Sequence, residues 1–165
     1  MRGEVTVRDA RLGQAAAGLL AALGASYSEG MVHWVKKGLL ATSFRPGYRP
    51  GAEYTVPREA VEAWVAEKRA AGIASIICLL GRDQLPLYER ALPQGLLRFY
   101  EESGFDVASI PAPDGMAEPF TPAQYQAAWE AFAALPKPVL VHCSAGHDRT
   151  GRVVSYLLSR IQHGA

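Results

Sequence analysis

The sequence has very few cysteines and almost no net charge, and it lacks any long apolar run. Two cysteines among 165 residues argue against a disulfide framework and for a reducing compartment, so we expect a cytoplasmic protein. The 17 basic and 16 acidic side chains nearly cancel, and this balance gives no bulk attraction to nucleic acid or to an anionic membrane. No apolar run approaches the length of a membrane span.

The sequence also contains neither an internal repeat nor a disordered linker. Its length lies within the usual size of one compact domain. We therefore predict a single domain over residues 1–165, and we expect a monomer. Residues 15–24 are rich in alanine and leucine, which predicts an additional helical segment within residues 1–30.

The most informative stretch is a run of ten residues near the C-terminus. It places a cysteine and an arginine six positions apart, among two glycines, a hydroxyl and two histidines: His142-Cys143-Ser144-Ala145-Gly146-His147-Asp148-Arg149-Thr150-Gly151. The apolar residues 138–142 before it predict a buried strand. Apolar residues at helical spacing after it predict a helix from Thr150 onward. The run is therefore a strand-to-helix loop, whose inward N–H groups and helix dipole suit an anion.

The same loop carries reactive side chains. A positive field favours the thiolate, which is the reactive form of a cysteine, and the planar fork of Arg149 can grip two phosphate oxygens. The segment from Gly146 to Gly151 has the glycine spacing of a nucleotide-binding loop, but the lysine and hydroxyl that define such a loop are missing. His142, Cys143 and His147 lack the paired spacing of a zinc site, so we expect no metal.

The pattern His-Cys-x5-Arg-Ser/Thr resembles the signature of the cysteine-based protein tyrosine phosphatases. The resemblance is most specific over residues 139–151, extends more loosely from about residue 38, and is to the compact, dual-specificity branch. It implies an α/β fold with a central, mostly parallel sheet flanked by helices, and phosphomonoester hydrolysis through a phosphocysteine intermediate without a cofactor. It implies these roles: Cys143 as nucleophile, Arg149 as phosphate binder, His142 orienting the loop, Thr150 as a hydroxyl near the sulfur, and phosphate binding by Ser144, Ala145, Gly146, His147, Asp148 and Arg149.

Transfer of a phosphoryl group to cysteine also needs a proton for the departing oxygen. Asp114 is the first candidate, because it lies in a proline- and glycine-rich loop after a predicted strand at residues 105–110, where the resembled family carries its general acid. Asp148 is the rival, since many members of that family carry an uncharged residue just before the arginine. Asp148 could supply the proton itself or could only pair with a nearby cation.

The substrate stays open at this point. Lipid phosphatases of the resembled superfamily often place lysines inside the loop, whereas this chain has His147, and a histidine carries only a fractional charge near neutral pH. We therefore expect a phosphorylated protein or a small phosphomonoester as substrate. The alternatives are a phosphoinositide or inositol-polyphosphate phosphatase and, from another class, a phosphate-binding module with little catalysis.

The remaining segments alternate between helix and strand, which favours an α/β sheet with active residues beyond the carboxyl ends of the strands. We predict two short strands within residues 32–44, a helix from Pro57 to Gly72, a central strand at residues 72–80 and a helix opened by the capping box at Thr121–Gln124. Residues 45–51 and 81–83 are loop candidates for the rim of the site, with Arg45 or Arg49 solvated or touching substrate. Cys78 is either buried strand filler or the partner of Cys143 in a reversible disulfide.

Overall fold

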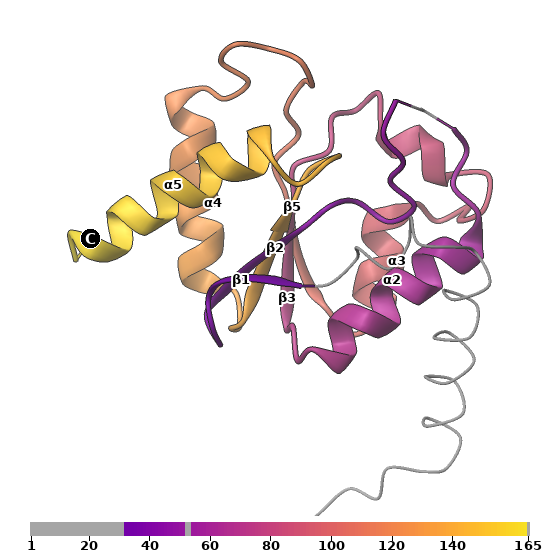
Figure 1. Cartoon of the computed structure of the whole chain (residues 1–165), viewed down its shortest axis with the longest axis horizontal. Coiled ribbons are helices and arrows are strands. Elements are labelled where there is room, and N and C mark those ends of the chain that lie inside the picture. The colour runs from indigo at the N-terminus through magenta and orange to yellow at the C-terminus, as the bar shows by residue number, and fades with distance from the viewer. Residues whose placement is uncertain (1–31, 52–53, 165) are drawn as a thin grey trace, which may run out of the picture.

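A five-stranded sheet forms the centre of the molecule (Figure 1). The structure is a computed structural model that describes residues 32–51 and 54–164. The strand order is β1-β2-β5-β3-β4, and only β1 is antiparallel to its neighbour. The strands are β1 (His33–Lys36), β2 (Leu40–Ser43), β3 (Ser75–Cys78), β4 (Asp106–Ser109) and β5 (Val139–His142). The predicted α/β class with a mostly parallel sheet is confirmed.

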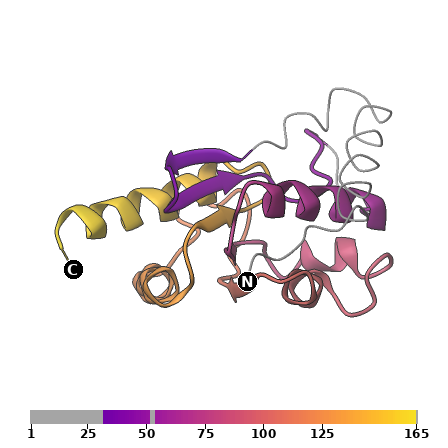
Figure 2. The same cartoon turned by 90° about the horizontal axis from the view of Figure 1, so that it is seen from below.

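Two helices cover each face of this sheet (Figures 1 and 2). On one face lie α2 (Arg58–Ala70) and α3 (Leu96–Glu102), and on the other lie α4 (Pro122–Ala134) and α5 (Asp148–Gln162). None of the described helices is long and apolar enough to cross a membrane. The helical segment predicted within residues 1–30 lies outside the described residues, and the single domain over 1–165 stays a prediction.

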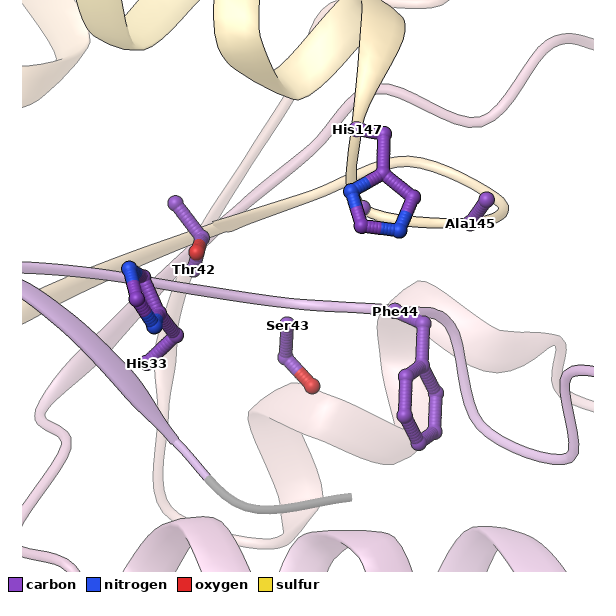
Figure 3. A pocket seen from close by; sticks show the side chains of 7 residues that line it. His33, Thr42, Ser43, Phe44, Ala145 and His147 are labelled. Atoms are coloured by element: carbon purple, nitrogen blue, oxygen red, sulfur yellow. The ribbon is translucent and has the colours of Figure 1, made fainter. Parts of the chain in front are cut away.

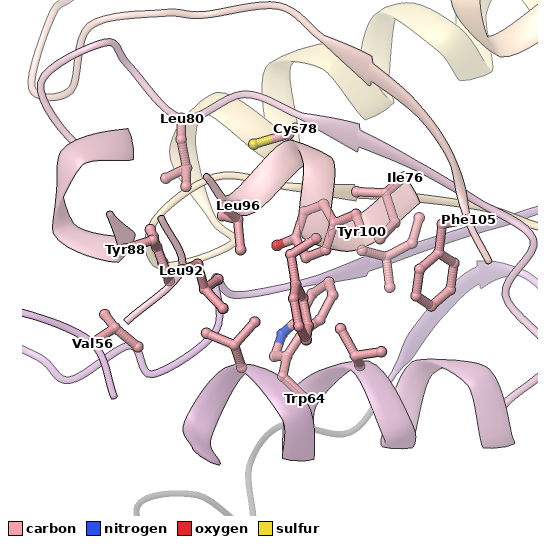
Figure 4. Packing of buried hydrophobic residues seen from close by; sticks show 14 of the residues in the cluster. Val56, Trp64, Ile76, Cys78, Leu80, Tyr88, Leu92, Leu96, Tyr100 and Phe105 are labelled. Atoms are coloured by element: carbon pink, nitrogen blue, oxygen red, sulfur yellow. The ribbon is translucent and has the colours of Figure 1, made fainter. Parts of the chain in front are cut away.

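The central strands are buried on both faces, so the sheet separates two apolar cores. Alternate residues of a strand point to opposite faces, and accordingly Ile76 packs among the side chains of α2 and α3, whereas Ile77 packs among those of α4 and α5. Figure 4 shows the first core, in which the rings of Trp64 and Tyr100 lie between α2 and the sheet. This double burial explains why β3 and β5 read in the sequence as short continuous apolar runs.

The capping box predicted at the start of α4 is present. Gln124 N donates to Thr121 Oγ1 over 3.2 Å, and Thr121 N donates to Gln124 Oε1 over 2.9 Å. The Gln124 side chain makes one more hydrogen bond, from Nε2 to the carbonyl oxygen of Pro111 at 3.0 Å. The helix is thereby joined to the loop that precedes it.

Two short elements and one helix boundary differ from the sequence prediction. The 3-10 helix η2 (Leu85–Tyr88) and the helix α3 were not predicted. Leu96, Phe99 and Tyr100 have the i, i+3, i+4 spacing of a helix and are buried, but two turns are too short for a firm pattern. The last helix begins at Asp148 rather than at Thr150, because the polar residues of its first turn do not enter the apolar pattern.

Candidate active site

The loop at residues 143–149, here called the Cys143 loop, joins β5 to α5. Its residue Gly146 has a φ of +76°, which side-chain-bearing residues rarely adopt. A Cβ atom at Gly146 would lie 2.6 Å from the carbonyl oxygen of Ser43. Only glycine therefore lets the loop pack against the end of β2.

Backbone donors line this loop. None of the N–H groups from Ser144 to His147 donates a hydrogen bond to another residue in the described part of the chain. Residues 144–146 are partly exposed and His147 is exposed, and the positive end of the α5 dipole lies at the same place. These donors and the dipole suit an anion, and we call this part of the loop the cradle; the buried Cys143 lies at its start.

Arg149 lies in the first turn of α5 and is only 1% exposed. Its Nη1 donates to Gln84 Oε1 at 2.8 Å and to the carbonyl oxygens of Ala112 at 2.9 Å and Leu79 at 3.3 Å. Its Nη2 makes no hydrogen bond within the described residues. Nη1 therefore holds the guanidinium in place, while the N–H donors of Nη2 have no hydrogen-bond acceptor among the described residues.

Asp114 reaches this guanidinium from the loop at residues 111–121, here called the Asp114 loop. Its Oδ2 lies 3.4 Å from Arg149 Nη2 and 3.5 Å from Gln84 Nε2, and its Oδ1 accepts from Gly115 N at 3.0 Å. The side chain is 54% exposed, so one oxygen meets the arginine while the group stays accessible to solvent. The structure thus brings Asp114 next to Arg149, although 35 positions separate them in the sequence.

Asp148 is oriented differently. Its carboxylate is 61% exposed and pairs with Arg152 one turn along α5, at 3.2 Å. Arg152 also pairs with Glu118 of the Asp114 loop at 3.3 Å, and Glu118 accepts a hydrogen bond from the hydroxyl of Tyr125. Asp148, Arg152 and Glu118 therefore form an exposed network of ion pairs. This agrees with the alternative prediction that Asp148 pairs with a nearby cation.

His142 supports the cradle from inside the sheet. Its Nδ1 lies 3.0 Å from the carbonyl oxygen of Cys143, and its Nε2 lies 3.0 Å from the hydroxyl of Tyr100. Burial is the main cause that lowers the pKa of His142 to about 4, and nearby cations lower it further, so the ring is neutral at pH 7. Because a carbonyl only accepts, Nδ1 carries the proton, and Nε2 accepts from Tyr100.

Arg45 supports the cradle from the other side of Ser144. Its Nε donates to Ser144 Oγ and its Nη1 to Tyr88 Oη, both at 3.1 Å, and its backbone N donates to the Ser144 carbonyl at 2.9 Å. The side chain is 1% exposed and has no carboxylate partner among the described residues. The expectation of a solvated Arg45 is therefore wrong, because the side chain turns inward beneath the loop.

Two side chains singled out from the sequence contribute less than the others. Thr150 is buried, but its hydroxyl makes no hydrogen bond within the described residues, to the Cys143 sulfur included. Cys78 packs with α2 and α3, whereas Cys143 packs with α4 and α5, and both thiols are free. Burial raises the pKa of Cys78 to about 12. These observations favour strand filler over a redox partner for Cys78.

A cavity of about 540 Å³ lies beside the Cys143 loop. Figure 3 shows His33 of β1 on one side of it and His147 of the loop on the other. Its remaining lining residues are Thr42, Ser43, Phe44, Ala145 and Gly146. The described residues contain no group of three or more His, Cys, Asp or Glu side chains that could hold a metal ion.

Comparison with known proteins agrees with this geometry. Residues 111–163 match the tyrosine phosphatase family, and this segment spans the Asp114 loop, α4, β5, the Cys143 loop and α5. The fold is similar to that of solved phosphatases over most of the chain. Over residues 111–163 the chain resembles the tyrosine phosphatase family.

Three solved phosphatase structures are similar to this chain in fold. Tk-PTP in its active form is 26% identical, with a TM-score of 0.52 over 81% of this chain and 75% of that one. Kinase associated phosphatase is 24% identical, with a TM-score of 0.56 over 72% and 64%. A putative phosphatase from Shewanella putrefaciens is 20% identical, with a TM-score of 0.53 over 79% and 72%. No curated protein matches this chain by sequence.

Two polar residues of the site, Gln84 and Tyr100, were not predicted, and Arg45 was predicted only as solvated or touching substrate. Gln84 and Tyr100 contact Arg149 and His142 across 65 and 42 positions, and Arg45 contacts Ser144 across 99. No local sequence pattern predicts contacts between residues so far apart in the chain. A usable signal was the place of Gln84 after the central strand, where side chains of an α/β sheet meet a site.

Proposed function

We propose that this chain hydrolyses phosphomonoesters on proteins, as tyrosine and dual-specificity phosphatases do, through a phosphocysteine intermediate. The observation that carries the proposal is the buried Arg149, whose Nη1 is held by three oxygens while Nη2 makes no hydrogen bond in the described part of the chain. The charge of Arg149 is paired with Asp114 at 3.4 Å, but buried donors normally also have a hydrogen-bond acceptor. A phosphate dianion bound among the loop N–H groups would provide that acceptor.

In the first step, the Cys143 thiolate attacks phosphorus in line with the ester oxygen. The S–P bond forms as the P–O bond breaks, and the departing oxygen takes the electron pair. The backbone donors of residues 144–149 and the Arg149 fork hold the three equatorial oxygens as charge shifts among them. Asp114 supplies the proton that converts the departing oxygen into an alcohol or a phenol.

In the second step, water attacks the phosphocysteine. Asp114 takes one proton from the water, the S–P bond breaks, and inorganic phosphate and the Cys143 thiolate are released. Both steps place the carboxyl of Asp114 on the side of phosphorus away from the sulfur. Its contact with Arg149 Nη2 at 3.4 Å supports this role.

Asp114 is preferred over Asp148 as the general acid. The Asp148 carboxylate is engaged by Arg152 on the outer surface of α5, whereas Asp114 contacts the phosphate-binding arginine directly. We expect Asp114→Ala to lose more activity toward phenyl phosphate than toward para-nitrophenyl phosphate, because the poorer leaving group needs the proton more. Asp148→Ala is the matched control. If only Asp148→Ala shows the leaving-group dependence, the assignment is reversed.

An inositol-polyphosphate or phosphoinositide phosphatase is the second candidate. The cavity beside the Cys143 loop favours it, because the imidazoles of His33 and His147 are suited to a further phosphate group. The absence of lysine from residues 143–149 favours a singly phosphorylated side chain instead. A turnover panel of phosphotyrosine peptides, phosphothreonine peptides and inositol phosphates separates the two, since the physiological class has the highest kcat/KM.

We propose that the enzyme works as a monomer in the cytoplasm, where a catalytic thiol stays reduced. The mechanism as a whole is tested by Cys143→Ser, which should lower para-nitrophenyl phosphate turnover by more than about a thousandfold. Cys78→Ser is the matched control, and we expect it to keep wild-type activity. Retained turnover in Cys143→Ser would refute the mechanism. A wild-type protein without vanadate-sensitive hydrolysis would be a phosphate-binding module.

A further inference from the structure

Gln84 ends the loop after β3 and is only 1% exposed. Both ends of its amide are used. Its Oε1 accepts from Arg149 Nη1 at 2.8 Å and from Gly81 N at 3.3 Å, and its Nε2 donates to Asp114 Oδ2 at 3.5 Å. One buried side chain thus touches both groups to which the proposed function gives a role in phosphate binding and proton transfer.

The chemistry of these partners settles how the amide is oriented. Arg149 can only donate, so the oxygen of the amide must face it. An ionised Asp114 can only accept, so the NH₂ group must face that carboxylate. A glutamate at position 84 would keep the acceptor for Arg149, but it would lose the donor and place a second carboxylate against Asp114. A methionine would supply neither hydrogen bond.

The segments that meet at Gln84 come from three parts of the chain. Arg149 belongs to α5, Gln84 follows β3, and Asp114 follows β4. Arg149 Nη1 also donates to the Ala112 carbonyl oxygen of the Asp114 loop. A Cβ at Gly81 would lie 3.1 Å from the Ala112 oxygen. Glycine at position 81 therefore allows the Asp114 loop to come close enough for this arrangement.

We propose that Gln84 is a positioning residue that fixes Arg149 and Asp114 relative to one another, so that a bound phosphate and its proton donor are aligned by one amide. The inference rests on the proposed function. Gln84 does not touch the reacting atoms. It acts through the two residues that do, by hydrogen-bonding to both of them.

The decisive variant is Gln84→Glu, which retains the contact to Arg149 and removes the donor to Asp114. We expect vanadate inhibition to stay within about threefold of wild type, while kcat falls about tenfold or more for phenyl phosphate and less for para-nitrophenyl phosphate. Gln84→Met removes both contacts, so it should weaken vanadate inhibition as well. Gln94→Glu is the matched control, because Gln94 also donates to a carboxylate, that of Glu102, on an exposed surface.

A second comparison shows whether Gln84 acts through Asp114. In an Asp114→Asn background, Gln84→Glu should cause no further leaving-group dependence, because the group that it misplaces is already absent. An additional loss of similar size in that background overturns the proposal, as does a Gln84→Glu variant with wild-type kinetics.

An Asp114→Asn enzyme with undiminished phenyl phosphate turnover refutes both this proposal and the acid assignment. Loss from Gln84→Glu that is equal for both leaving groups refutes this proposal alone. Far-ultraviolet circular dichroism of each variant verifies the fold.

Discussion

The two sides of the Cys143 loop are built from different interactions. On the side of α2 and α3, the loop rests on a half-buried hydrogen bond from Arg45 to Ser144 and on buried ones between Tyr100, His142 and the Cys143 carbonyl. On the side of α4 and the Asp114 loop, Asp148, Arg152 and Glu118 form ion pairs in solvent. Buried polar contacts are costly to break and exposed ion pairs are not. The inner side therefore fixes the shape of the loop.

The largest effect that this comparison predicts is a loss of stability in acid. The pKa of His142 is lowered to about 4 in the folded protein, against about 6.5 in an unfolded chain. Between these pH values the unfolded chain binds the proton and the folded protein does not, so stability falls as the pH decreases through this window. The full loss from this residue is on the order of 3 kcal/mol.

Urea unfolding at several pH values between 7 and 4 would measure this loss. The reference is His142→Asn, which removes the titrating ring and should flatten that part of the pH dependence. Other groups that titrate in the same range affect both proteins equally. An equally steep decline in His142→Asn would show that another group is responsible.

A smaller loss is expected from Arg45→Met. The substitution removes two charge-assisted hydrogen bonds beneath the Cys143 loop, but it also removes a buried cation without a carboxylate partner among the described residues, and the two effects partly offset. We expect about 2 kcal/mol lower unfolding free energy and a reduced kcat. Arg98→Met, on the exposed face of α3, is the control and should change little. A variant as stable and as active as wild type would contradict a supporting role for Arg45.

The smallest effect should come from the outer side. Arg152→Met breaks the pairs to Asp148 and Glu118, and exposed pairs of this kind contribute little to stability because water and salt screen them. Urea unfolding at pH 7 and at two salt concentrations is the measurement, since added salt should remove most of the difference between the two proteins. A loss as large as that of Arg45→Met would mean that both sides hold the loop.

Much of the fold could be predicted because its signals are local. The apolar runs of β3 and β5, the proline before α2 and the capping box of α4 each lie within a few residues. Strand order, the antiparallel β1 and the short α3 could not be read in the same way. Strand order depends on which segments pair across the sheet. The helix α3 is stabilised by the packing of Leu96, Phe99 and Tyr100 in the core rather than by the helix propensity of its short sequence.

The residues of the candidate site also differ in whether a local sequence signal predicts them. Cys143 and Arg149 share one loop, so their spacing carried the prediction, and Asp114 followed from the resemblance to a phosphatase family. Gln84, Arg45 and Tyr100 come from three other segments, and their contacts exist only after the sheet has formed. The sequence therefore predicts the groups assigned to chemistry better than the groups that hold them in place.

The hydrogen bond from Gln124 to the Pro111 carbonyl has a consequence for the Asp114 loop. The same side chain caps α4 through Thr121, so it links Pro111 and Thr121, the first and last residues of the loop. The two ends of the loop are therefore held together, and a rearrangement of the loop would be confined to its exposed residues, 113–118. Asp114 lies in this exposed segment, close to the end held through Pro111.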